Sequence, residues 1–115
     1  MTVTIYHNPR CSKSRQTLAL IEGKGIQPDI VHYLETPPDA AELKTILSKL
    51  GMGPRDIIRR GESVYKELGL ADPKLGDAAL ITALTGHPEL IERPIVVKGD
   101  NARIGRPPQA VLEIL

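Results

Sequence analysis

The chain has 115 residues, 41% of them hydrophobic but only 3% aromatic, so it has the size of one domain whose core is built from Leu, Ile, Val and Ala. Its 15 basic and 14 acidic residues give a formal charge of +1, which argues against a polybasic surface for nucleic acid or membranes, and the few aromatic residues exclude a stacking platform for single strands. Neither a signal-peptide pattern nor an apolar run of about 18 residues is visible, so we expect a cytoplasmic protein with no membrane partner.

The first third of the chain predicts a parallel βαβ unit. Residues 2–6, TVTIY, alternate and are rich in β-branched types, which predicts a strand. Residues 12–24 predict a helix that begins near a serine and ends at Gly23 and Gly25. A second strand follows over residues 29–34, DIVHYL. A strand, a helix and a strand within about 35 residues form a unit whose two strands are parallel.

Residues 38–91, approximately, predict a helical insertion. Between the prolines of ETPPDA and the pair Gly53-Pro54, apolar side chains recur with the spacing i, i+3, i+4 and i+7 of an amphipathic helix. They are Leu43, Ile46, Leu47 and Leu50. Further helical segments are predicted around RDIIRRG, SVYKELGL and DAALITALTG.

The last quarter of the chain predicts an antiparallel hairpin and a closing helix. Strands are expected at residues 95–97 and 102–105, joined by a turn through Gly99, Asp100 and Asn101. Adding this hairpin to the βαβ unit gives an α/β fold with a four-stranded mixed sheet. We therefore predict one thioredoxin-like domain over residues 1–115, with the helical insertion inside it.

The only cysteine, Cys11, stands in HNPRCSKSR between the first strand and the first helix. A free thiol is only partly ionised at pH 7, and a helix start together with the nearby cations favours the reactive thiolate. Ser14 stands where a C-x-x-C motif has its second cysteine, so a resolving thiol must come from another molecule. The alternative interpretation is a buried structural cysteine.

Five segments resemble one known family when they are taken together and in order. The chain is similar over essentially its whole length to the glutaredoxin-coupled arsenate reductases, in particular to the short bacterial members. The segments that carry this resemblance are IYHNPRCSKSRQTL, HYLETPP, YKELGLA, ERPIVV and RIGRPPQAVLEIL. The resemblance implies a thioredoxin-like fold and Cys11 as the catalytic nucleophile. It also implies that Arg59, Arg93 and Arg106 are catalytic and bind the oxyanion, with Arg60 as the alternative to Arg59.

The resemblance implies further features around the cysteine. The Arg93-Pro94 bond is expected to be cis, and His7 is expected to support the thiolate. Arg15 is a weaker candidate for contact with the thiolate or the anion.

The implied reaction is the reduction of arsenate to arsenite through a covalent adduct on Cys11. Glutathione is the expected co-substrate and glutaredoxin the expected partner, with no bound cofactor, no nucleic acid and a monomeric chain. A zinc site is not expected, because His32, His87 and a single cysteine have no suitable ligand spacing.

Two alternatives to arsenate reduction stay open at this point. The same cysteine would serve a glutathione-dependent monothiol oxidoreductase with a different substrate. The fold also resembles that of redox regulators that bind RNA polymerase, although Ser14 removes the C-x-x-C pair that those regulators commonly carry.

Overall fold

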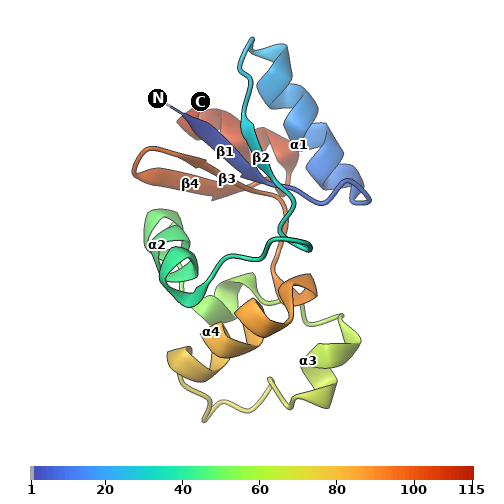
Figure 1. Ribbon diagram of the computed structural model, residues 1–115, viewed down its shortest axis with the longest axis vertical. Coiled ribbons are helices and arrows are strands. Elements are labelled where there is room, and N and C mark those ends of the chain that lie inside the picture. The colour runs from blue at the N-terminus through green and yellow to red at the C-terminus, as the bar shows by residue number, and fades with distance from the viewer. Residues whose placement is uncertain (1) are drawn as a thin grey trace. The chain divides into compact units, whose positions relative to one another are not determined.

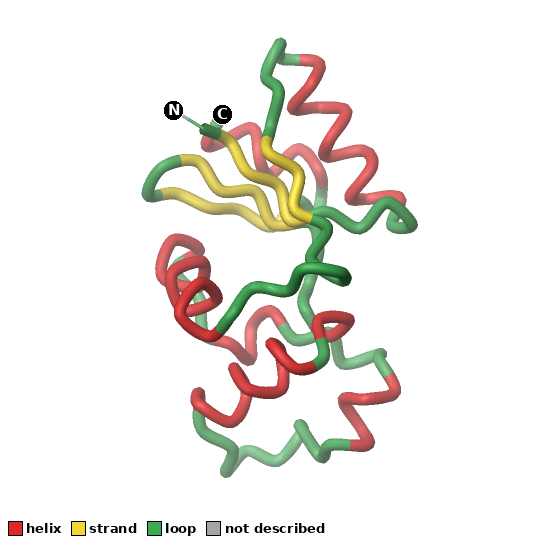
Figure 2. Tube along the Cα trace, in the orientation of Figure 1, coloured by secondary structure: helices red, strands yellow, loops and turns green. Residues whose placement is uncertain are grey.

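The computed structural model describes residues 2–115, which form two compact units. The first unit comprises the chain up to Thr36 together with Arg93–Leu115, and the second comprises Pro37–Glu92. Figure 2 shows the sheet in the first unit and a set of helices joined by loops in the second. Among the described residues, no helix combines the length and the apolar character needed to cross a membrane.

The first unit is built on a four-stranded mixed sheet (Figure 1). Its strands lie in the order β2 (Asp29–Val31), β1 (Val3–Tyr6), β3 (Ile95–Lys98) and β4 (Asn101–Ile104). β1 pairs in parallel with β2 and antiparallel with β3, and β3 pairs antiparallel with β4. This arrangement confirms the predicted α/β fold with its βαβ unit and C-terminal hairpin.

A tight turn sets the register of the hairpin. Lys98 pairs with Asn101, so only Gly99 and Asp100 connect the two strands. Gly99 has φ +60°, whereas Asp100 keeps a negative φ. A positive φ at the first central residue alone is typical of a type II′ turn, which favours glycine at that position and matches the twist of the strands.

One face of the sheet carries the core of the first unit. The alternating residues Val3 and Ile5 of β1 and the neighbouring Val96 of β3 are buried against α1 (Ser12–Gly23) and the closing helix η3 (Pro108–Ile114). Each helix contributes one fully buried apolar side chain to this cluster, Ile21 from α1 and Val111 from η3. Because β1 passes into α1 through residues 7–11 alone, this packing fixes the position of Cys11.

The second unit is helical. It contains α2 (Ala40–Leu50), η1 (Pro54–Ile57), α3 (Ser63–Glu67), α4 (Asp77–Gly86) and η2 (Pro88–Leu90). The predicted apolar stripe of α2 faces the core of this unit, since Leu43, Ile46 and Leu47 are buried. Asp39 caps the start of α2 by accepting a hydrogen bond from the N–H of Glu42 at 2.8 Å, and Gly51 ends it in the left-handed conformation with φ +70°.

The predicted second strand is too long. β2 ends at Val31, and His32 lies outside the strand rather than within it. The N–H groups of Glu35 and Thr36 both donate to the carbonyl of His32, at 3.0 and 2.9 Å, and so close a turn at that point.

The helix predicted around RDIIRRG is also wrong in extent. Only η1 is helical, with 3-10 geometry, and Arg59 and Arg60 follow it in non-helical backbone. Ile58 forms a β-bridge with Ile91, and the N–H of Arg59 donates to the carbonyl of Leu90 at 2.8 Å. This long-range pairing draws the chain out of the helix. The closing helix η3 likewise has 3-10 rather than α geometry, and α3 ends at Glu67, before the end of SVYKELGL.

Candidate active site

Cys11 is the N-cap residue of α1. Its backbone is extended, with φ −96° and ψ 122°, while its carbonyl accepts the first helical hydrogen bond from the N–H of Arg15 at 3.0 Å. The loop before it is closed by Asn8, whose carbonyl accepts the Cys11 N–H and whose Oδ1 accepts the Arg10 N–H, both at 3.0 Å. The half-buried sulfur is therefore held on a fixed backbone at the start of a helix.

Ser14 ties this loop to α1 from inside. Its side chain is fully buried, and its Oγ accepts the N–H of Asn8 at 3.0 Å and lies 2.6 Å from Nδ1 of His7. One hydroxyl thus connects the end of β1 to the first turn of the helix. From the sequence, Ser14 is identified only as the residue that replaces the second cysteine of a C-x-x-C motif, and its contacts are not predicted. A serine in the first helical turn is a common partner for nearby backbone, but no local signal identifies His7 as its contact.

The surroundings of Cys11 favour its thiolate. Burial raises the pKa of the thiol, but the backbone N–H of Ser14, the guanidinium of Arg93 and the N–H of Lys13 outweigh this effect and lower the pKa below its ordinary value. The sulfur makes no regular capping hydrogen bond to the helix, so the interaction with the two N–H groups is largely electrostatic. The direction of this shift agrees with the expectation from the sequence.

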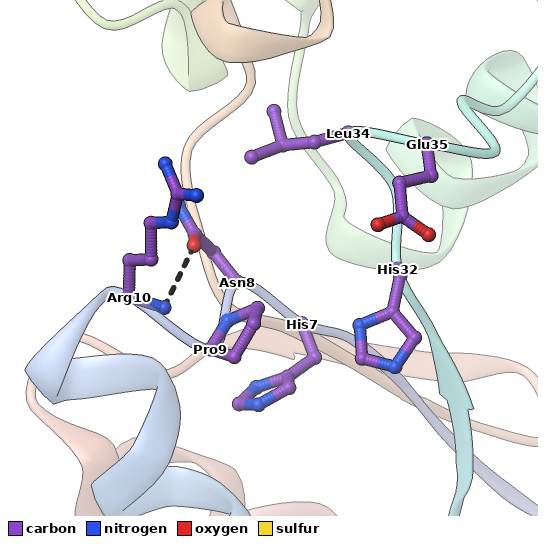
Figure 3. Close-up of a pocket in the computed structure, with 7 residues that line it drawn as sticks. All are labelled: His7, Asn8, Pro9, Arg10, His32, Leu34 and Glu35. Carbon is purple, nitrogen blue, oxygen red and sulfur yellow. Dashed lines mark hydrogen bonds between the residues drawn. The ribbon is translucent and has the colours of Figure 1, made fainter.

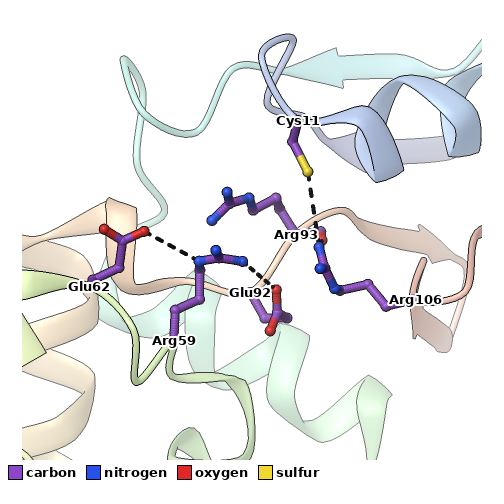
Figure 4. Close-up of polar contacts among 6 residues, drawn as sticks. All are labelled: Cys11, Arg59, Glu62, Glu92, Arg93 and Arg106. Atoms are coloured by element: carbon purple, nitrogen blue, oxygen red, sulfur yellow. Dashed lines mark hydrogen bonds and ion pairs between the residues drawn. The ribbon is translucent and has the colours of Figure 1, made fainter.

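Two of the three predicted arginines lie at the sulfur. Nη1 of Arg106 is 4.0 Å from Sγ of Cys11 and donates a hydrogen bond to the carbonyl of Arg93 at 3.2 Å (Figure 4). The Arg93-Pro94 peptide bond is cis, as predicted, and the Arg106-Pro107 bond is also cis. Arg93 precedes β3 and Arg106 follows β4, so the two segments that flank the hairpin present their guanidinium groups to the loop that follows β1.

Gly105 allows these two segments to approach each other closely. Its N–H donates to the carbonyl of Pro94 at 2.9 Å. A Cβ atom at this position would lie 2.8 Å from Cγ of Pro94 and would collide with Oγ1 of Thr17. Only glycine fits without displacement of its neighbours, and Arg106 is the next residue in the chain.

His7 and Arg15 both link the loop to α1, His7 through its contact with Ser14 and Arg15 through a bond to the loop backbone. Nη1 of Arg15 donates to the carbonyl of Pro9 at 2.9 Å and so braces the turn before Cys11. Burial, followed by the charges of His32 and Arg15, lowers the pKa of His7, which keeps its imidazole neutral near pH 7. We infer that both residues would support the thiolate by fixing the loop, and their assigned roles stay predictions.

Arg59 belongs to the second unit. Its Nη1 lies 2.9 Å from Oε1 of Glu92, and its Nε lies 3.4 Å from Oε1 of Glu62 (Figure 4). Arg60, the alternative, is exposed. The predicted role of Arg59 in oxyanion binding stays a prediction. Over residues 2–115, no group of three or more His, Cys, Asp or Glu side chains is arranged to hold a metal ion.

The protein is a single-cysteine member of the thioredoxin-like proteins. Its mixed sheet presents one cysteine at a helix start, beside two arginines that each precede a cis-proline. The chain belongs to the ArsC family, whose family model matches residues 6–114.

Known proteins of similar sequence and structure cover the chain almost completely. It is 53% identical over 116 residues to an arsenate reductase of Haemophilus influenzae, with 100% of both chains covered. It is 57% identical over 114 residues to the uncharacterized protein YfgD of Escherichia coli, covering 98% of this chain and 96% of that protein. The structure of an arsenate reductase from Vibrio cholerae matches with a TM-score of 0.97 and 56% identity, covering 100% of this chain and 98% of the other.

Proposed function

We propose that this protein reduces arsenate to arsenite, with Cys11 as the nucleophile, glutathione as the reductant and glutaredoxin as the partner that regenerates the thiol. The observation that carries the proposal is the distance of 4.0 Å between Nη1 of Arg106 and Sγ of Cys11, in a site where Arg93 also lowers the pKa of the thiol. A nucleophile and two groups that can bind an anion therefore stand together.

Arginine suits this substrate for two reasons. Arsenate has the shape of phosphate and carries one or two negative charges near pH 7, and a planar guanidinium can donate two parallel hydrogen bonds to such oxygens. A guanidinium also stays charged at every relevant pH, so it cannot neutralise itself by giving its proton to the bound anion. Arg93 and Arg106 would hold the oxyanion against the sulfur.

The first step forms a covalent bond between sulfur and arsenic. The Cys11 thiolate attacks As(V) and displaces one hydroxyl group, which takes up a proton and leaves as water. Sulfur and arsenic keep their oxidation states, and the product is an adduct of Cys11 with As(V). A lowered thiol pKa helps here because it supplies the anionic nucleophile at neutral pH.

The second step carries out the reduction. Glutathione thiolate attacks the Cys11 sulfur, the sulfur–sulfur bond forms, and the sulfur–arsenic bond breaks with its electron pair going to arsenic. Arsenic gains two electrons and leaves as As(III), while the two sulfurs together lose two electrons and become a mixed disulfide. Ser14 offers no second thiol, so a thiol of glutaredoxin attacks the glutathione sulfur and releases the Cys11 thiolate. A reducing compartment such as the cytoplasm suits this cycle.

The test is arsenate-dependent NADPH oxidation in a coupled system of glutathione, glutaredoxin and glutathione reductase. The wild type is expected to be active, Cys11→Ser inactive and Arg93→Ala strongly reduced. Arg103→Ala serves as a control of equal charge change, because that guanidinium is bound to Glu113 at 2.9 Å. Appreciable arsenate reduction by Cys11→Ser would overturn the proposal.

The same variants distinguish a monothiol oxidoreductase with another substrate. Removal of glutathione from a model mixed disulfide needs Cys11 but no oxyanion, so Arg93→Ala should reduce it much less than arsenate reduction. If the wild type shows only this exchange activity and no arsenate-dependent rate, the monothiol oxidoreductase is the correct assignment.

A further inference from the structure

A pocket of about 310 Å³ lies beside the loop that carries Cys11, and neither Arg93 nor Arg106 is among the residues that line it. We call it the His7–His32 pocket, and it is lined by His7, Asn8, Pro9, Arg10, His32, Leu34 and Glu35 (Figure 3). Residues 7–10 follow β1 and residues 32–35 follow β2. The pocket is therefore at the carboxyl ends of two parallel strands, which is the usual ligand position in open α/β sheets.

Two mostly buried side chains of the pocket, His7 and Asn8, each have one nitrogen that is available to a ligand. His7 is only 5% exposed and Asn8 only 9%. Nδ1 of His7 contacts Ser14, and Oδ1 of Asn8 accepts the Arg10 N–H, but Nε2 of His7 and Nδ2 of Asn8 make no hydrogen bond to any residue between 2 and 115. Oγ of Ser14 accepts the Asn8 N–H, and its hydrogen can donate to Nδ1 of His7. In that tautomer the imidazole proton is on Nε2, which can then donate into the pocket.

The pocket thus offers hydrogen-bond donors at its wall and opposite charges at its rim. Neither Nε2 of His7 nor Nδ2 of Asn8 is itself among the buried unpaired atoms of the described residues, so each is open to the pocket and can donate to an acceptor there. Arg10 and Glu35 are exposed and stand on opposite sides of the opening in Figure 3. Such a site suits a small zwitterionic peptide with acceptor carbonyls in its middle.

We propose that the His7–His32 pocket binds the peptide portion of glutathione, an inference that rests on the proposed function. The peptide carbonyls would accept from Nδ2 of Asn8 and Nε2 of His7. The glycyl carboxylate would pair with Arg10 and the α-ammonium with Glu35.

Two further facts fit this occupant. Arg10 lines the pocket and is the residue before Cys11, so the pocket begins about 3.8 Å, one Cα–Cα step, from the cysteine. An extended tripeptide spans about 10 Å, which is long enough to bring its central thiol to the Cys11 sulfur. The arginines hold the arsenic side of the adduct, and a thiol that attacks sulfur in line arrives from the side opposite the sulfur–arsenic bond. A separate peptide site meets that need.

The test uses S-methylglutathione, an unreactive analogue, titrated into the isotope-labelled protein and followed by NMR. Binding should shift the amide signals of His7, Asn8, Arg10 and residues 32–35. An exposed ion pair is worth up to about 1 kcal/mol, so Arg10→Gln and Glu35→Gln are each expected to raise Kd up to about fivefold. Arg103→Gln, the matched control on β4, should leave Kd unchanged.

Kinetics give a second measurement on the same variants. Arg10→Gln and Glu35→Gln should raise KM for glutathione while KM for arsenate stays the same. Shifts confined to other residues, or equal Kd values in wild type, Arg10→Gln and Glu35→Gln, would overturn the pocket assignment.

The two proposals fail separately. The titration requires no turnover, so a wild type that binds S-methylglutathione in the pocket but reduces no arsenate supports the pocket and contradicts the proposed function. A wild type that reduces arsenate with glutathione but binds the analogue elsewhere supports the function and contradicts the pocket.

Discussion

Replacing Arg106 with alanine removes a positive charge whose nearest nitrogen lies 4.0 Å from the sulfur of Cys11. The thiolate loses an attractive partner while the neutral thiol loses almost nothing, so the pKa of Cys11 rises. At neutral pH the fraction of thiolate falls, and alkylation of Cys11 becomes slower.

The distance sets the size of this effect. Two unit charges 4 Å apart interact with about 1 kcal/mol in water and about 4 kcal/mol at an effective dielectric constant of 20. Arg106 is exposed, so the value for water applies. About 1 kcal/mol corresponds to a loss of about fivefold in the ratio of thiolate to thiol. Arg106→Lys keeps a charge and should lose less.

The assay is the rate of alkylation by iodoacetamide as a function of pH, followed by intact mass. Below the pKa of Cys11 the variant should react about fivefold more slowly than the wild type. At high pH Cys11 is fully ionised in both the variant and the wild type, so the two alkylation rates should converge. Arg103→Ala, which removes the same charge from a residue bound to Glu113, should follow the wild-type curve.

Two results would refute this reasoning. Superimposable curves for wild type and Arg106→Ala would mean that the guanidinium does not act on the sulfur. An equal loss at every pH would mean that the substitution changes access to Cys11 rather than its ionisation.

Three further predictions concern the scaffold of the site. Ser14→Ala leaves the Asn8 N–H without its acceptor and should lower the free energy of unfolding by about 1–3 kcal/mol in urea titrations. Thr17→Val, the control, removes a buried hydroxyl bonded within α1 and should lower the free energy of unfolding by less. Equal losses in the two variants would contradict a special role for Ser14. Gly105→Ala places a Cβ 2.8 Å from Cγ of Pro94, so it should lower the free energy of unfolding by about 1–3 kcal/mol and reduce arsenate turnover. Gly61→Ala is the control, because a Cβ at that position meets nothing within 4 Å. Equal behaviour of the two variants would refute the packing argument. The lowered pKa of buried His7 means that the unfolded chain takes up a proton first as the pH falls below about 6.5, so the free energy of unfolding should decrease through that range; a slope unchanged in His7→Gln would show that other groups cause it.

The local sequence was enough to predict the elements that carry Cys11. The alternation in TVTIY, the serine-rich start of α1 and the glycines after it act within a few residues, and β1 and α1 form where they are expected. The stripe of α2 is similarly local, and its buried residues match the predicted spacing. Short-range patterns therefore located the cysteine at a strand–helix junction.

Long-range contacts decided what the sequence could not. The bridge between Ile58 and Ile91 joins residues far apart in the chain and prevents the helix that RDIIRRG favours locally. The Glu92 partner of Arg59 is 33 residues away. Proximity of Arg93 and Arg106 to Cys11 followed only from the family resemblance, since the preceding-proline pattern indicates an extended backbone and no partner.

Contacts of Ser14 illustrate the same limit at short range. Its position in the chain is visible, but its burial and its contact with His7 depend on how α1 packs on the sheet. The nitrogens of His7 and Asn8 that are available to a ligand follow from that same packing.

The most direct test of the account is the intact mass of the protein after incubation with arsenate and glutathione in the absence of glutaredoxin. The account predicts that one glutathionyl group accumulates on Cys11 only when arsenate is present, that dithiothreitol removes it, and that Cys11→Ser gains none. Arsenite release without any modification of Cys11, or glutathionylation that proceeds equally without arsenate, would contradict the account.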